Sequence, residues 1–245
     1  MRFAKILLIV VISFFAIQVK SQRLITFMAS DSLEVTADYY ETDVQSNKYM
    51  LLFHQAEYSR GEYQQIATRL IKLGYNCIAV DLRFGNEVNF VNNETAMRAK
   101  KGGYSATMLD CEKDMIAAID YVKSIDKNPR IFLLGSSFSA SLSLILAKQR
   151  DDVEAVIAFS PGEFFGTDLN VESEIIGLKK PVFVGCPRSE YYYVTQLMSG
   201  VESKKKVVFK PEGSDGLHGA KTLWWESATR DEFWLSLLFF LKDIK

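Results

Sequence analysis

The stretch Gly135–Ser139 has the residue types and the spacing of a serine nucleophile. The apolar run Ile131–Leu134 predicts a buried strand before it, and Ser139–Lys148 predicts a helix directly after it. A strand that turns this sharply into a helix needs small residues around the turn, and the residue at the apex projects from the sheet. Ser137 occupies the apex, and the pattern therefore predicts a nucleophile elbow, although Gly-x-Ser-x-small also occurs by chance.

A serine nucleophile needs a general base, and the sequence offers two histidines. His54 ends a predicted strand before the elbow, whereas His218 lies in the turn-rich segment Gly213–Gly219 after the last predicted strand. One known chain order of such sites is serine, then acid, then histidine. We therefore predict that His218 is the base and that His54 is a structural residue shaping its turn; an ordinary surface role is the alternative for His218.

The acid that orients the base should follow the predicted strand Pro181–Gly185, and Glu190 is the residue that fits. A carboxylate at the start of a helix, where it stabilises the first turn, is the alternative explanation for Glu190. Glu163 and Asp168 are rival acids because both follow the preceding strand. Asp215 is too close to His218 in sequence, since it would have to fold back.

An oxyanion hole needs two backbone donors. The first predicted donor is the N–H of Phe138, immediately after the nucleophile and at the positive end of the following helix. The second should come from the turn after the strand that ends at His54. We favour the N–H of Ala56 there, with Gln55 as the alternative.

Strand and helix patterns alternate from about residue 49 onward. This alternation predicts an α/β fold with a mostly parallel central sheet, helices on both faces and ligands at the carboxyl ends of the strands. Two earlier strands, 24–28 and 33–40, should form an antiparallel pair at one edge. The remaining predicted strands are 49–54, 76–81, 131–134, 153–159, 181–185 and 205–210, and the predicted helices are 59–73, 107–125, 139–148, 189–198 and 230–242.

The segment 82–104 lacks a strong periodicity and is long for a connection in a compact domain. We predict that it is functional or partly helical and that it covers part of a pocket. Asp81 and Arg83, at the preceding strand end, should bind a polar substrate group or pair with each other. An aromatic-lined pocket is one interpretation of nearby aromatic residues, and ordinary packing is expected for at least half of them: Phe164, Phe165, Tyr191, Tyr192, Trp224 and Trp225.

Taken together, four segments in this order resemble the α/β-hydrolases of the dienelactone hydrolase-like group. They are Leu52–Gln55, the elbow Gly135–Ser139, Pro181–Val184 leading to Glu190, and His218–Gly219. The resemblance covers about residues 24–243. It implies an α/β-hydrolase fold with little or no lid domain, and hydrolysis of small-molecule carboxylic esters or related acyl compounds without a cofactor.

Two departures from that group concern the elbow. Ser139 stands where the last glycine is usual, and Ser137 stands where the dienelactone hydrolases proper use a cysteine. The substrate of those enzymes therefore cannot be carried over. A peptidase or amidase on the same scaffold, and a non-catalytic binding protein that keeps the fold, remain alternatives.

The N-terminus has the three parts of a secretory signal peptide. Arg2 and Lys5 precede the apolar segment Ile6–Ile17, and small or modest residues at positions 19 and 21 predict cleavage before Gln22. A membrane anchor is the alternative, but about twelve apolar residues are too few to span a bilayer comfortably. We predict that residues 1–21 are removed, that the protein is secreted or periplasmic without stable membrane insertion, and that residues 22–245 form a single domain.

The composition of the chain excludes further classes of protein. The chain has 245 residues, 48% of them hydrophobic, which is enough for the core of one large domain. Its net charge is −1 with both signs interspersed, so the basic surface of a nucleic-acid-binding protein is missing. Three cysteines without clustered spacing, Cys77, Cys111 and Cys186, argue against a disulfide framework or a zinc site and predict buried thiols.

Overall fold

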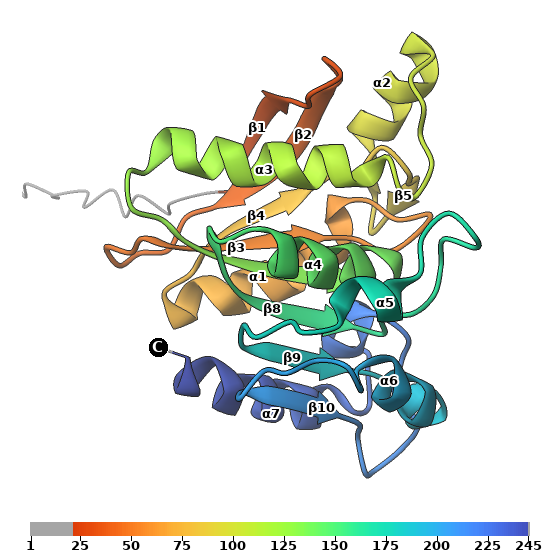
Figure 1. Cartoon of the computed structure of the whole chain (residues 1–245). Coiled ribbons are helices and arrows are strands. Elements are labelled where there is room, and N and C mark those ends of the chain that lie inside the picture. The colour runs from red at the N-terminus through yellow and green to blue at the C-terminus, as the bar shows by residue number, and fades with distance from the viewer. Residues whose placement is uncertain (1–21, 245) are drawn as a thin grey trace, which may run out of the picture.

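The computed structural model describes residues 22–244, which fold around one eight-stranded sheet (Figure 1). The strand order is β1-β2-β4-β3-β7-β8-β9-β10. Strand β2 alone runs antiparallel to its neighbours β1 and β4, and all other pairs in this sheet are parallel. The strands are β1 (Arg23–Met28), β2 (Glu34–Tyr40), β3 (Lys48–Phe53), β4 (Asn76–Val80), β7 (Arg130–Ser136), β8 (Val153–Phe159), β9 (Val182–Gly185) and β10 (Lys206–Phe209).

Helices cover both faces of the sheet, which confirms the predicted α/β-hydrolase architecture (Figure 1). Helices α3 and α4 pack on one face together with α5 and α6, whereas α1 and α7 pack on the other. The helices are α1 (Gln64–Leu70), α2 (Glu94–Gly102), α3 (Cys111–Ile125), α4 (Phe138–Gln149), α5 (Val171–Ile175), α6 (Tyr191–Leu197) and α7 (Arg230–Asp243).

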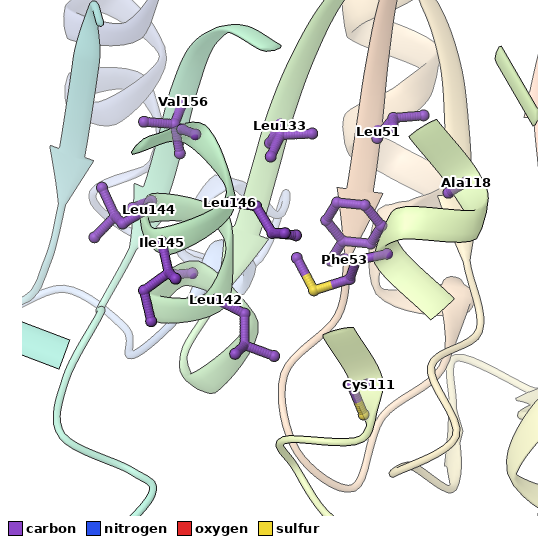
Figure 2. Packing of buried hydrophobic residues seen from close by; sticks show 14 of the residues in the cluster. Leu51, Phe53, Cys111, Ala118, Leu133, Leu142, Leu144, Ile145, Leu146 and Val156 are labelled. Carbon is purple, nitrogen blue, oxygen red and sulfur yellow. The ribbon is translucent and has the colours of Figure 1, made fainter. Parts of the chain in front are cut away.

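The central strands are apolar throughout because both of their faces are covered. Successive strand residues point to opposite faces, so Leu51 and Phe53 of β3 join the core under α3 and α4, while Met50 and Leu52 join the core under α1 and α7. Figure 2 shows part of the first of these cores, where Leu133 of β7 lies between its strand partners Leu51 of β3 and Val156 of β8. Each such fully buried side chain contributes about 1.5–3 kcal/mol of transfer free energy.

Two predicted helices differ in detail from those observed. The helix expected over residues 59–73 is α1 flanked by 3₁₀ turns at Arg60–Tyr63 and Ile71–Leu73, and Gly74 ends it with φ 86° as predicted. Helix α3 begins at Cys111 rather than at Thr107. The carboxylate of Asp110 accepts from the N–H and the hydroxyl of Thr107, and this local turn replaces the first helical turn.

The segment 82–104 is partly helical, as predicted. It forms a short hairpin of β5 (Glu87–Val88) and β6 (Val91–Asn92), followed by α2, whose first turn is capped by Asn93. The hairpin is tied to the turn after β3 because the Ser59 hydroxyl donates to Val91 O at 2.6 Å. Within residues 22–244 this segment is packed against the main body, and it does not form a separate lid domain.

One short helix was not predicted from the sequence. Helix α5 follows β8, where only a break at Ser160–Gly162 is evident. Its N-terminal N–H groups are satisfied by the Asn170 side chain, which accepts from Ser173 N–H, and by the Glu163 carboxylate. A helix of five residues is too short to produce a clear periodic pattern.

The predicted signal peptide, residues 1–21, lies outside the described residues. Of the helices in the described part, none is long and apolar enough to cross a membrane. Strand β1 begins at Arg23, the second residue after the predicted cleavage site.

The close crossing of β7 and α4 leads to a prediction about Gly135. A Cβ atom at this position would lie 2.5 Å from Ala140 Cα and from Ser139 O in the first turn of α4. We expect Gly135→Ala to force the strand and the helix apart and to lower the free energy of unfolding in urea by about 1–3 kcal/mol. In the control Gly213→Ala, the nearest atom is the flexible end of Glu232. Equal stabilities of the two variants would contradict the prediction.

Candidate active site

The turn from β7 into α4 places Ser137 in a left-handed backbone conformation. Its φ is 60° and its ψ is −123°, a combination that costs a non-glycine residue about 1–3 kcal/mol. The Ser137 N–H donates to Phe159 O at the end of β8, at 2.8 Å. The neighbouring strand therefore holds the strained residue at the carboxyl end of the sheet, where 6% of its surface is exposed.

Ser139, which stands in place of the usual glycine, connects the elbow to β3. Its Oγ lies 2.7 Å from Phe53 O and accepts the N–H of Ser136 at 2.9 Å. Phe53 is the last residue of β3, and the turn with the predicted oxyanion donor follows it. The hydroxyl thus makes a link between the two halves of the site that a glycine would lack.

The structure brings together the three residues predicted to form the triad. His218 Nε2 lies 2.9 Å from Ser137 Oγ, and His218 Nδ1 lies 2.6 Å from Glu190 Oε1. Glu190 ends a 3₁₀ turn, Arg188–Glu190, that follows β9, and His218 lies in the loop after β10. The His218 side chain is 38% exposed and the Glu190 side chain 29% exposed, so the site is open to solvent.

The rival acids are engaged elsewhere or exposed. Both carboxylate oxygens of Glu163 accept N–H groups of α5, at 2.7 and 2.8 Å. Asp168 is an exposed residue, and no hydrogen bond joins it to His218. Asp215 accepts the N–H and the hydroxyl of Ser189, at 2.8 and 2.9 Å. Asp215 therefore fixes the segment that carries Glu190, a role that the sequence analysis missed.

The predicted oxyanion donors lie in the expected segments. No described residue accepts a hydrogen bond from the N–H of Ala56 or of Phe138, the first residue of α4. The Gln55 N–H, by contrast, donates to Glu62 Oε2 at 2.8 Å. This bond removes Gln55 from the alternatives and favours Ala56.

His54 is a buried structural residue, as predicted. The Leu82 N–H donates to its Nε2 at 2.9 Å, so the ring proton is on Nδ1, which lies 2.8 Å from Gln55 O. Burial lowers the pKa of His54 to about 4, and the ring is therefore neutral at neutral pH. It connects the turn after β3 to the residues after β4.

The predictions for Asp81 and Arg83 were wrong. Asp81 pairs with Arg60, whose guanidinium lies 2.6 Å from Asp81 Oδ2. Arg83 is fully buried and pairs with Asp114 at 2.8 Å, and with Asp31. Both residues therefore hold loops in place. Each pairs with a residue distant in sequence, which the strand pattern could not indicate.

Most of the aromatic residues considered for a pocket are packing residues, as expected. Phe165 is buried in the core under α4, and Phe164 and Tyr191 pack against the same core. Trp224 packs on the opposite face, while Tyr192 is 83% exposed and Trp225 is 69% exposed.

Two further side chains position the loops of the site and escape the sequence analysis. Ser160 accepts the Gly219 N–H at 3.0 Å, next to His218. The fully buried Glu62 accepts the Ser136 hydroxyl at 2.8 Å in addition to the Gln55 N–H. In sequence Glu62 looks like an ordinary carboxylate near a helix start, and nothing there signals its burial.

Comparisons with known proteins agree with this architecture. A profile of the dienelactone hydrolase family matches residues 39–191, more than half of the chain. The chain belongs to the dienelactone hydrolase family. A comparison with curated protein sequences gives no match.

Several solved structures share the fold at low sequence identity. The esterase Pf2001 of Pyrococcus furiosus is 17% identical, with 91% of each chain covered and a TM-score of 0.69. A dienelactone hydrolase of Anabaena variabilis is 14% identical over 91% of this chain and 97% of its own, with a TM-score of 0.67. Est1E of Butyrivibrio proteoclasticus, solved with ferulic acid bound, is 15% identical over 86% and 98%, with a TM-score of 0.64.

Membership of the dienelactone hydrolase family confirms the resemblance found in the sequence and makes the protein a carboxylic ester hydrolase. The thiols of this family member are buried, as predicted. All three cysteines are free, and burial raises the pKa of Cys186 to about 12, so it is a protonated thiol at neutral pH. A serine, Ser137, stands at the turn between β7 and α4.

The burial of His54 predicts a loss of stability in acid. Because its pKa is about 4 in the folded chain and 6.5 in the unfolded chain, the unfolded chain binds the proton first, and stability present above pH 6.5 is lost as the pH falls toward 4. We expect His54 to remove about 2–3 kcal/mol of unfolding free energy between pH 7 and pH 4.5.

Urea unfolding at both pH values measures this effect in the wild type and in His54→Gln, which lacks the titrating ring. His218→Gln is the control because it leaves His54 intact. A His54→Gln variant with the same acid sensitivity as the wild type would contradict the prediction.

Proposed function

We propose that the protein is an exported serine hydrolase that cleaves small carboxylic esters through an acyl-enzyme, with Ser137 as nucleophile, His218 as base and Glu190 as orienting acid. The observation that carries the proposal is the continuous line of contacts from Glu190 Oε1 through both ring nitrogens of His218 to Ser137 Oγ, with distances of 2.6 and 2.9 Å. In this line Nδ1–H donates to the carboxylate, which leaves Nε2 free to accept the serine proton.

The reaction proceeds in two halves. Ser137 Oγ attacks the ester carbonyl carbon while its proton moves to His218 Nε2, and the imidazolium then gives that proton to the departing alkoxide. The acyl group stays on Oγ until a water, deprotonated by His218, attacks the same carbon. Cleavage of the carbon–Oγ bond releases the carboxylic acid and returns the proton to Ser137.

The negative charge that develops on the carbonyl oxygen is stabilised by the N–H groups of Ala56 and Phe138. Neither group has a partner among the described residues, and Phe138 opens α4, whose N-terminus adds a favourable dipole. Loss of one such donor raises the barrier by about 3–4 kcal/mol.

Membership of the dienelactone hydrolase family favours small-molecule esters as substrates, and the partly exposed His218 leaves the site open to solvent. Est1E, a protein of the same fold, was solved with ferulic acid bound. Methyl ferulate therefore belongs beside p-nitrophenyl acetate and butyrate in a first substrate panel. Activity on an aminoacyl amide but not on its matched ester would favour the amidase alternative instead.

Replacement of the nucleophile tests the proposed mechanism. We expect Ser137→Ala to lower kcat for p-nitrophenyl butyrate by at least about 10³-fold, because only binding and oxyanion stabilisation remain. A fluorophosphonate probe should label the wild type on Ser137 and leave the variant unlabelled, as peptide mass spectrometry would reveal.

Ser124→Ala, at the exposed end of α3, is the matched control and should keep full activity. Turnover that survives in Ser137→Ala would place the nucleophile elsewhere. A folded wild type without turnover on any ester of the panel would contradict the ester hydrolase mechanism.

Export makes a separate prediction. The signal peptide proposal is supported by the sequence pattern of residues 1–21 and by the start of β1 at Arg23, two residues after the expected cleavage. Expression of the full chain in a bacterial host with a secretory pathway should yield a soluble exported protein whose N-terminal residue is Gln22. Recovery of the uncleaved chain from the membrane fraction would support the anchor alternative.

A further inference from the structure

Glu62 is a fully buried carboxylate that forms no ion pair with any residue between 22 and 244. Its two oxygens are used separately. Oε2 accepts the Gln55 N–H from the turn after β3, and Oε1 accepts the Ser136 hydroxyl from the end of β7, both at 2.8 Å. One side chain therefore connects the two segments that provide the proposed oxyanion donors.

The connection continues to the loop that carries His218. The Ser136 hydroxyl, while donating to Glu62, accepts the Ala220 N–H at 2.8 Å. The Trp224 indole N–H, four residues further along, donates to the backbone oxygen of Glu62 at 2.8 Å. All three segments of the site thus meet on Glu62 or on its direct partner.

Both of these hydrogen bonds are accepted by Glu62, as an ionised carboxylate does. Gln55 N–H can only donate, and the Ser136 hydroxyl donates to Glu62 while its oxygen accepts from Ala220. A glutamine at position 62 would aim an NH₂ group at one of these donors. Burying a charge without an ion-pair partner costs free energy. An apolar or amide side chain at position 62 would fill the same space at a smaller desolvation cost.

We propose that Glu62 is a positioning residue for ester hydrolysis, whose ionised carboxylate holds the Ala56 N–H in register with Ser137 and His218. The inference rests on the proposed function, because the relative position of these groups matters only if they act on one substrate. Glu62 touches no substrate itself. It fixes the backbone on either side of the reacting atoms, where a displacement of about 1 Å costs on the order of 10²-fold in rate.

The charged and titratable groups around Glu62 are few. Burial raises the pKa of Glu62 to about 7, while Lys221 and His218 act in the opposite direction. Tyr63 donates its hydroxyl to Phe53 O, and Arg60 is paired with Asp38 and Asp81. The carboxylate is therefore protonated in mild acid, where one of its two oxygens becomes a donor instead of an acceptor.

The decisive variant is Glu62→Gln, assayed with p-nitrophenyl butyrate. We expect kcat to fall by about 10- to 100-fold with KM within about twofold of the wild-type value, because the transition state depends on the oxyanion donors more than the bound ester does. Glu154→Gln, the same chemical change at a residue on β8 paired with Arg130, is the control and should keep wild-type kcat. A Glu62→Gln variant with the kcat of this control would overturn the proposal.

A pH profile separates positioning from simple stability. Just below the ionisations of both Glu62 and the base, the slope of log(kcat/KM) against pH should rise toward about 2 in the wild type and stay near about 1 in Glu62→Gln. A merely structural role would lower the curve without changing its slope. Identical slopes in the two proteins would contradict a requirement for the ionised carboxylate.

Amide hydrogen exchange provides a readout that does not depend on turnover. The N–H groups of Gln55 and Ala220 should exchange at least about tenfold faster in Glu62→Gln than in Glu154→Gln. If the wild type hydrolyses no ester, the proposed function fails while this measurement still decides whether Glu62 anchors the site. Unchanged exchange in an active, folded variant would refute the positioning role alone.

Ser136→Ala covers the case in which Glu62→Gln does not fold. It keeps Glu62 and its contact with Gln55 but removes the link to Ala220. We expect faster exchange at Ala220 but not at Gln55, and a smaller loss of kcat than in Glu62→Gln. Wild-type kcat together with wild-type exchange in Ser136→Ala would overturn the proposal.

Discussion

The left-handed backbone of Ser137 is the constraint on which the site depends. A φ of 60° at a serine is unfavourable in isolation, and it persists because the surroundings leave no alternative. The N–H of Ser137 is bound to β8, the hydroxyl of Ser139 contacts the end of β3, and Gly135 allows α4 to pass close to β7. Three parallel strands thus hold one turn.

This arrangement also gives a physical reason for the unusual elbow sequence. The resemblance noted from the sequence leads to the expectation of a cysteine and a final glycine at the elbow, whereas this chain has Ser137 and Ser139. A glycine there would permit the close approach but would make no contact with β3. The hydroxyl of Ser139 adds that contact, so the departure from the motif strengthens the connection between the elbow and the end of β3.

Two buried ionisable groups behind the site respond to pH in opposite directions. His54 is held neutral, and its burial favours the folded chain at higher pH, whereas the raised pKa of Glu62 favours the folded chain at lower pH. Both side chains bind backbone groups of Gln55. The turn after β3 is therefore held by two groups whose desolvation costs stability, and the apolar cores on both faces of the sheet offset that cost.

The sequence by itself determined the alternation of strands and helices, the position of the elbow, and the candidates Ser137, His218 and Glu190, because these depend on local periodicity and on residue types at known places in the chain order. The predictions for segments without such local signals were less accurate, as the start of α3 and the missed α5 illustrate.

Only the tertiary structure decided which polar groups pair. Arg83 finds Asp114 and Asp31 rather than Asp81, Asp215 supports Ser189 rather than His218, and Glu62 meets Ser136, which is 74 residues away. Such pairings follow from the distances between side chains after the sheet has formed. The spacing of residues in the sequence does not reveal those distances. A carboxylate in a loop has the same local sequence pattern whether its side chain lies in solvent or in the core.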